Sequence, residues 1–135
     1  MKRFATAIVF CLLSSGACSR AQSAESILGT WTTQHRLYTP HNGIGGRAFG
    51  VSIATFRPDG TFKLDLLLDN GRMVSVGRYR FDGHSLYYVL DDYEPKGIGL
   101  DPGPAYHHPC TEPVEFDDVH NQMHLNGNVW NHQSR

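Results

Sequence analysis

The stretch Thr55-Phe56-Arg57-Pro58-Asp59-Gly60-Thr61-Phe62 decides the fold class of this chain. Two apolar segments meet there at a Pro-Asp-Gly turn. Two more turn signals, Asn70-Gly71 and Asp82-Gly83, follow at close and even spacing. Asn-Gly and Asp-Gly supply residues that tolerate a positive φ, which tight hairpin turns require. The spacing therefore predicts a meander of antiparallel strands.

Between the turns, apolar and polar residues alternate with the period of two that a half-buried strand needs. The apolar faces are formed by Phe62, Leu64, Leu66 and Leu68, by Phe49, Val51 and Ile53 before them, and by Leu86, Tyr88 and Leu90 after them. Gly77, inside the third run, predicts a bulge or a tight bend. No segment after Leu13 has helical periodicity of useful length, so the sequence predicts an all-β domain.

The run Leu28-Gly29-Thr30-Trp31 resembles the glycine-x-tryptophan start of lipocalin-like barrels. The hairpins around 55–62 and 77–86 are similar to those of bacterial lipocalin-like domains, so the likeness covers about residues 27–91. It implies a small antiparallel meander barrel, with the tryptophan plugging one end of the interior. It also implies an apolar pocket and no catalytic residues.

Two stretches interrupt the strands. Residues 39–46 are rich in glycine and read as a loop, and a long Pro/Gly loop late in the chain spans 92–113. A connection that long is usually functional or disordered. The long loop and the few strands after it depart from the lipocalin pattern, which argues against a full eight-stranded closed barrel.

Residues 1–23 read as a secretory signal segment, because two cations precede about ten apolar residues and a run of small residues. The apolar run is half the length that a membrane-spanning helix needs. Ser15-Gly16-Ala17-Cys18 resembles a lipobox, in which Cys18 is lipidated. Ordinary cleavage after 21–23 is the alternative. Both alternatives predict one exported β domain, 24–135, in the periplasm or at the periplasmic face of the outer membrane.

The charge of the mature domain restricts its partners. The leading segment holds three of the 12 basic side chains and none of the 13 acidic ones, which leaves a net charge of about −4. A mildly acidic domain repels nucleic acid and anionic lipid surfaces. A membrane contact is expected only through the lipid anchor, and the predicted partner is an envelope protein or a small apolar ligand.

The leading prediction for function is non-catalytic binding in the barrel interior and at the long loop. The residues expected to line this site are Trp31, Phe49, Phe56, Phe62, Leu64, Tyr88, Tyr93 and Tyr106. Tyrosine-rich, proline-stiffened loops make good contact surfaces. The alternatives are that the barrel residues form a packed core and that the loop tyrosines shield a sheet edge.

Binding without a cofactor is the leading prediction, and a copper or zinc site is its alternative, since imidazole and thiolate suit these metals. Its ligands would come from His107, His108, Cys110, His120 and His124, although adjacent histidines on an extended chain point in opposite directions. A weaker alternative is a small hydrolase that uses two carboxylates. Its candidates are Asp91, Asp92, Glu94, Asp101, Glu115, Asp117 and Asp118.

Overall fold

The computed structural model describes residues 23–134, apart from 42–43, 69–70 and 97–101, and gives only the backbone of residues 24, 35–41 and 44–49. The predicted signal segment and Cys18 lie outside the described residues. No helix among those described is long and apolar enough to cross a membrane. The elements are a 3-10 helix, η1 (Ala24–Ile27), and the strands β1 (Gly29–His41), β2 (Ile44–Phe56), β3 (Thr61–Leu68), β4 (Gly71–Phe81), β5 (Ser85–Glu94), β6 (Cys110–Asp117), β7 (Gln122–Leu125) and β8 (Asn128–His132).

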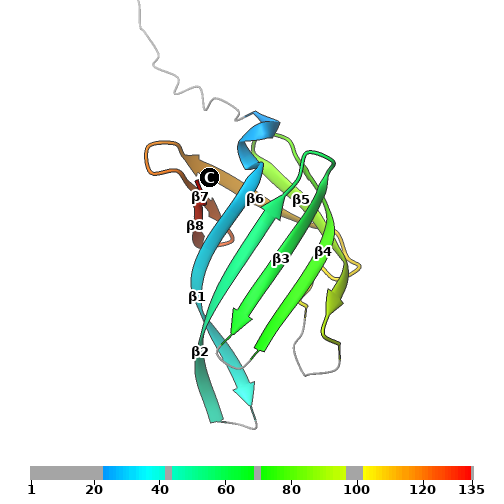
Figure 1. The fold of residues 1–135 in the computed structure, drawn as a ribbon, viewed down its shortest axis with the longest axis vertical. Helices are drawn as coiled ribbons and strands as arrows, with labels where there is room; N and C mark the ends of the chain where they lie inside the picture. The colour runs from blue at the N-terminus through cyan, green and yellow to red at the C-terminus, as the bar shows by residue number, and fades with distance from the viewer. Residues whose placement is uncertain (1–22, 42–43, 69–70, 97–101, 135) are drawn as a thin grey trace, which may run out of the picture.

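The eight strands form a closed antiparallel barrel in chain order (Figure 1). The all-β meander is confirmed, but the expectation that the barrel would not close with eight strands is wrong. The tail supplies the missing strands, because Asn126 and Gly127 both have positive φ and join β7 to β8 in a tight hairpin. β8 then pairs with β1 at Trp31 and Thr32.

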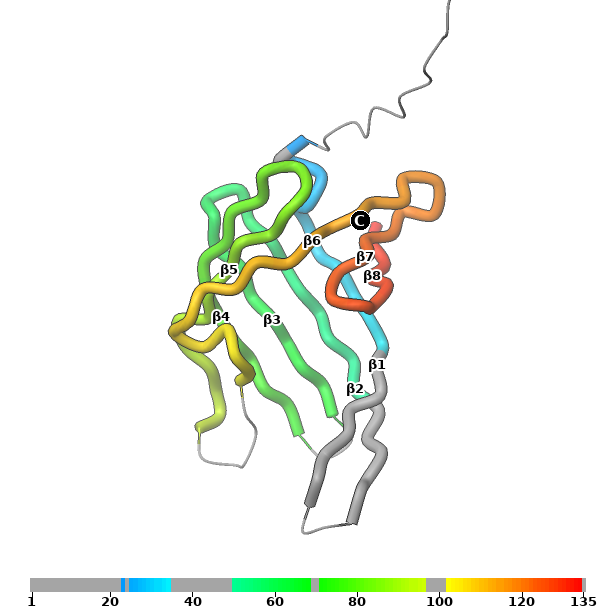
Figure 2. Tube along the Cα trace, turned by 180° about the vertical axis from the view of Figure 1, so that it is seen from behind, coloured from blue at the N-terminus to red at the C-terminus, as the bar shows by residue number. Residues whose placement is uncertain are grey.

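Closure is confined to one end of the barrel. β6 pairs with β5 only over 85–88, and β8 pairs with only two of the 13 residues of β1. Figure 2 shows β6 crossing the sheet, with the lower halves of β3 and β4 extending past it. We call the end that carries η1 and the turns at 57–60 and 82–84 the closed end.

The alternation in β2 has the opposite phase to the predicted one. Ala54 and Phe56 are buried in the interior, whereas Val51 and Ile53 are only half-buried and lie on the outer face. The physical reason is size, since Ala54 pairs with Trp31 of β1 and leaves room for the indole ring. The side chain of Phe49 lies outside the described residues.

Trp31 anchors the closed end. Its side chain is buried, and its Nε1 donates a hydrogen bond to the carbonyl oxygen of Ile27 at 2.9 Å, which ties β1 to η1. The ring packs edge-on against His132 of β8. Gly29 has a φ of 107°, and a Cβ there would lie 2.6 Å from Nε2 of His132. The glycine of the Gly-x-Trp motif therefore admits the histidine that closes the barrel.

The predicted bulge in β4 is present. The register between β4 and β5 shifts between Val76 and Gly77, so that Asp92 pairs with Val76 while Leu90 pairs with Gly77. Such a bulge bends the strand and increases its twist. It lets the sheet curve around the buried ring of Phe62, which pairs with Gly77 from the other side.

The two predicted loops differ in outcome. Residues 39–41 and 44–46 continue β1 and β2 as paired strands, so the first loop prediction is wrong for these residues. The late loop is present between β5 and β6, and its described part covers the edge of β5. The backbone N–H of Leu90 donates a hydrogen bond to the carbonyl oxygen of Ala105 at 2.8 Å. The backbone N–H of His107 donates one to the carbonyl oxygen of Leu90 at 2.9 Å. These bonds protect an edge that β6 leaves unpaired.

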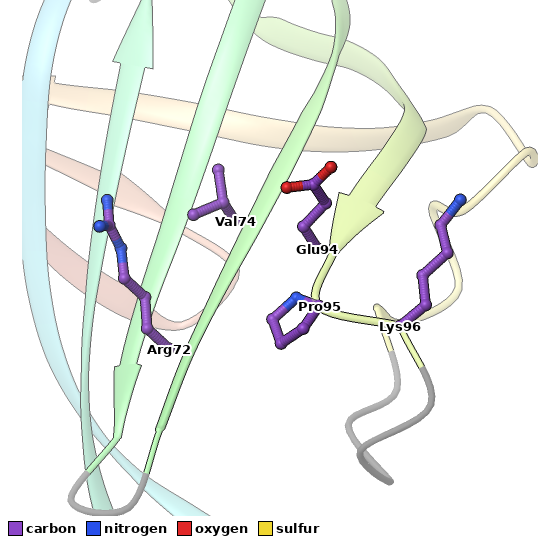
Figure 3. Close-up of a pocket in the computed structure, with 5 residues that line it drawn as sticks. All are labelled: Arg72, Val74, Glu94, Pro95 and Lys96. Atoms are coloured by element: carbon purple, nitrogen blue, oxygen red, sulfur yellow. The ribbon is translucent and has the colours of Figure 1, made fainter.

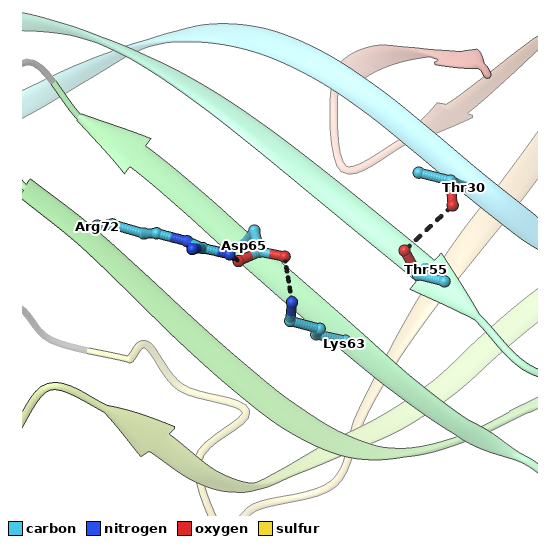
Figure 4. Close-up of polar contacts among 5 residues, drawn as sticks. All are labelled: Thr30, Thr55, Lys63, Asp65 and Arg72. Carbon is cyan, nitrogen blue, oxygen red and sulfur yellow. Dashed lines mark hydrogen bonds and ion pairs between the residues drawn. The ribbon is translucent and has the colours of Figure 1, made fainter.

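The outer face of the barrel carries an ion cluster around the buried Asp65, shown in Figure 4 beside the hydrogen bond between Thr30 and Thr55. The carboxylate of Asp65 on β3 accepts hydrogen bonds from Arg72 of the neighbouring strand and lies 2.9 Å from Nζ of Lys63. Partial burial opposes ionisation of Asp65, but the hydrogen bonds and charges of Lys63 and Arg72 prevail and lower its pKa from 3.8. The cluster therefore joins β3 to β4 as long as Asp65 is ionised.

We expect Asp65→Asn to weaken the acid sensitivity of the fold. Because the pKa of Asp65 is lower in the folded chain than in the unfolded one, its stabilising effect is complete above the unfolded value of 3.8 and is lost as the pH falls below it. The variant should be less stable at pH 7 and should lose less stability below 3.8. Urea unfolding across this range measures both effects, with the exposed Asp118→Asn as control. Parallel pH profiles for the Asp65 variant and the parent would contradict the assignment.

Candidate functional site

The side chains that face the barrel interior fall into two groups. At the closed end an apolar plug is formed by Trp31, Phe56, Phe62, Phe81, Leu86, Val114 and Met123, all of them buried. Beyond the plug, the strands present an inner wall of mixed polarity, formed by Thr33, Ser52, Leu66, Met73, Ser75 and Tyr93. Small barrels have room for at most one small ligand. Unlike the plug, the inner wall includes polar side chains as well as apolar ones.

Two buried polar atoms in this interior have no hydrogen-bond partner. They are Oγ of Ser75 on β4 and Nε1 of Trp130 on β8, and they are the only such side-chain atoms in the described part of the chain. Ser75 is 0% exposed and Trp130 is 9% exposed. Ser75 pairs with Leu64 on one side and Tyr93 on the other, and Trp130 pairs with the buried Met123. Both therefore point inwards.

An unpartnered polar group in a protein interior is costly. Each one destabilises the fold by about 1–3 kcal/mol, and native proteins contain few of them. Thr33, also buried on the inner wall, shows the usual arrangement, because its hydroxyl donates to the carbonyl oxygen of Val129 at 2.8 Å. Ser75 on the inner wall and Trp130, which belongs to the same buried apolar cluster as the plug, depart from this rule. A bound molecule could supply partners at these two positions.

The structure separates the residues predicted to line a ligand site. Trp31, Phe56 and Phe62 belong to the plug, where the rings of Phe56 and Phe62 stack at 5.7 Å between centroids. Tyr88 packs edge-on against Phe62, and Leu64 is half-buried beside the plug. These five form the packed side of the interior.

Tyr93 lies beside Ser75, and Tyr106 lies beside Tyr93. Their rings meet edge-on at 5.0 Å, and Tyr106 also packs against the core and against the ring of His107. Tyr93 pairs directly with Ser75 across β4 and β5. Of the predicted lining residues, Leu64 and Tyr93 pair with the unpartnered serine, and Tyr106 contacts Tyr93.

The structure does not assemble the five predicted metal ligands. His107, His108 and Cys110 lie at the end of the late loop, where the thiol contacts the carbonyl oxygen of His108 at 3.7 Å. His120 lies in the turn between β6 and β7 and bonds to Asp117, whereas His124 is exposed on β7. Among the residues described, no three histidine, cysteine or acidic side chains lie close enough together to bind a metal ion.

Three of the acidic residues considered for a hydrolase, Asp91, Asp92 and Asp117, are engaged in ion pairs. Asp91 pairs with Arg78, and Asp92 pairs with Lys96, each at 2.8 Å. The hydrogen bonds from these cations lower the pKa values of both carboxyls, and a bond from His120 lowers that of Asp117. A general acid requires a raised pKa. The pairing therefore favours structural roles for these three residues, and Asp101 lies outside the described residues.

Three grooves on the surface of the barrel are also candidate binding sites. One groove, of about 530 Å³, lies on the outer face between β4 and the end of β5 and is lined by Arg72, Val74, Glu94, Pro95 and Lys96 (Figure 3). Its two cations are already paired with Asp65 and Asp92. Two further grooves flank Leu28 and His132 at the closed end. None of the three contains a buried polar atom without a partner.

Sequence reasoning missed Ser75 and Trp130. A signal for Ser75 was present, because it occupies an inward position in a strand whose other inward residues include Met73, and a serine there is unusual for a packed core. No comparable signal for Trp130 is present in the sequence, because whether its Nε1 has a hydrogen-bond partner depends on which backbone atoms surround the ring. Alternation predicts the face of a residue but not its hydrogen-bond partners.

A comparison with models of known protein families finds no match for this chain. Comparisons with curated proteins and with solved structures find none either. The barrel architecture is the one that the lipocalin resemblance implies, while membership of that family stays a prediction from the residues themselves.

Proposed function

We propose that this protein is an exported, non-catalytic binding protein that holds a small, largely apolar molecule against its inner wall. The observation that carries the proposal is the pair of buried polar atoms without partners, Ser75 Oγ and Trp130 Nε1. A ligand that bonds to them would remove a cost of about 1–3 kcal/mol for each group. The apolar neighbours Leu64, Leu66 and Met73 would contact the rest of the molecule.

The topology supports access to the inner wall from the end opposite the plug. At the closed end the interior is filled by the buried side chains of the plug. Away from that end, β6 and β8 no longer pair with β5 and β1 over the described residues. A ligand would enter between these strands and stop at the plug.

Export and anchoring belong to the same proposal and rest on the sequence of residues 1–23. Lipidation of Cys18 would hold the domain at a membrane without a spanning segment. The periplasm or the periplasmic face of the outer membrane is then the place where the domain would meet its ligand. A denatured mass of the protein from the cells that produce it distinguishes a diacylglycerol-bearing Cys18 from a chain that begins at residue 24.

Native mass spectrometry of the same sample tests the binding function. We expect an organic mass that is present in the native spectrum and absent after denaturation. We also expect the stripped protein to bind Prodan, a neutral naphthyl ketone, with a blue shift of the probe's emission. The double variant Ser75→Ala/Trp130→Phe should bind Prodan at least about tenfold more weakly, because it lacks both hydrogen-bonding groups.

Two readouts separate loss of binding from loss of fold. Ser75→Ala removes an unpartnered hydroxyl, so it should leave the free energy of unfolding unchanged or raise it. Val129→Ala, on the outer face of β8, should leave Prodan binding unchanged. A protein without an organic mass and without Prodan binding would show that the interior is a filled core. Prodan binding that is unaltered in the stable Ser75→Ala variant and in the double variant would place the ligand elsewhere.

A further inference from the structure

The lysine and arginine side chains that the structure describes lie on the outside of the barrel. Of the lysines and arginines whose side chains the structure describes, none points into the interior. Arg57 is exposed at a turn, and Lys96 pairs with Asp92 on the late loop. The remaining four alternate with inward residues of β3 and β4 and bond or pack on the outer surface: Lys63, Arg72, Arg78 and Arg80.

The ionisable groups that do face inwards in the described part of the chain include no lysine and no arginine. Glu112 pairs with the buried Leu86 and shares the inward face of β6 with the buried Val114, where it is half-buried. Tyr88 lies beside it, and burial, with Cys110 and Glu112 nearby, raises the pKa of its phenol. Apart from the imidazole of His132, which packs on Trp31 at the closed end, the described part of the interior offers a negative charge no partner and adds one carboxylate of its own.

The two unpartnered groups differ in their hydrogen-bonding capacity. The indole Nε1 of Trp130 can only donate, while the hydroxyl of Ser75 can donate or accept. A ligand must therefore bring an acceptor oxygen for Trp130. A carboxylate would supply that oxygen, but burying an ionised carboxylate without a cation costs far more than the hydrogen bond returns.

We infer that the ligand is an uncharged molecule with an apolar skeleton and a carbonyl oxygen, which accepts a hydrogen bond from Trp130 Nε1, and that carboxylates are rejected. This inference rests on the proposed binding function. Esters, ketones and aldehydes meet its requirements, whereas free carboxylic acids at neutral pH do not. The discrimination comes from the missing cation rather than from the shape of the interior.

Three naphthalenes of nearly equal size test it. 2-Acetonaphthone carries a carbonyl group, 2-naphthoate replaces the methyl group of that ketone by an anionic oxygen, and 2-ethylnaphthalene has no acceptor. Titration calorimetry at pH 7 gives the three dissociation constants for the stripped protein. We expect the ketone to bind about three- to tenfold more tightly than 2-ethylnaphthalene. It should bind at least about tenfold more tightly than 2-naphthoate.

The variant Trp130→Phe keeps an aromatic ring and removes the donor. It should abolish the advantage of the ketone over 2-ethylnaphthalene, while Val129→Ala should preserve it. If 2-naphthoate binds as tightly as the ketone, or if the ketone keeps its advantage in Trp130→Phe, the inference on ligand class is wrong although binding itself stands. If none of the three binds, the proposed function fails and this inference fails with it.

Discussion

Gly77→Ala is expected to lower the free energy of unfolding by about 3 kcal/mol, at the upper end of the usual cost of overpacking. A Cβ at this position would lie 2.1 Å from the carbonyl oxygen of Val89 and 2.9 Å from Cε1 of Phe62. The first of these is a backbone atom of the neighbouring strand, so it cannot move aside without disturbing the pairing of β4 with β5. The bulge between Val76 and Gly77 should therefore be lost or the strands displaced.

The same strand provides the control. Gly71 begins β4, and a Cβ there would meet no atom within 4 Å. Gly71→Ala should therefore leave stability unchanged or raise it slightly, because alanine restricts the unfolded chain. Urea unfolding of both variants gives the two free energies. Equal effects for Gly77→Ala and Gly71→Ala would mean that β4 and β5 are not packed as described.

Trp31→Ala is expected to cost about 3–5 kcal/mol, the range found for large aromatic side chains in packed cores. Three losses combine in this variant. The indole is 3% exposed, its Nε1 bond holds the carbonyl oxygen of Ile27, and its ring packs against Phe116 and His132. Because these partners belong to η1, β6 and β8, the change weakens the closed end as a whole.

Intermediate and control variants make the result specific. Trp31→Phe keeps most of the ring contacts but leaves the carbonyl oxygen of Ile27 without its donor, so it should cost less than Trp31→Ala and still be clearly destabilising. Val129→Ala removes a partly exposed side chain and should cost little. Thermal or urea unfolding compares the three. A cost for Trp31→Ala no larger than that for Val129→Ala would contradict the anchoring role.

Local sequence determined the strands and most of their turns. The turns at 57–60 and 82–84 contain Gly60 and Gly83 with positive φ, as their Asp-Gly signals predict, and the turn at 126–127 follows from Asn-Gly in the same way. Gly77 marked the bulge correctly. These features depend on residues that are neighbours along the chain, and for that reason the sequence is sufficient to predict them.

The closure of the barrel and the composition of the site were decided by tertiary structure. β8 is a short strand whose pairing with β1 joins residues about 100 positions apart, and no local pattern specifies that contact. The phase of β2 depends on Trp31 lying opposite Ala54 rather than on the apolarity of Val51 and Ile53. Whether Ser75 and Trp130 have partners depends on atoms from other strands.

The sequence by itself therefore determined that this protein is a β meander with a tryptophan at its start, because turn chemistry and the period of two are local properties. Only the tertiary structure decided that eight strands close. It also decided that, among the residues it describes, the histidine, cysteine and acidic side chains form no metal site and two polar atoms are left unpartnered in the interior. The physical reason is that hydrogen-bond satisfaction and packing are set by all the groups around an atom, and in a barrel those groups come from distant parts of the chain.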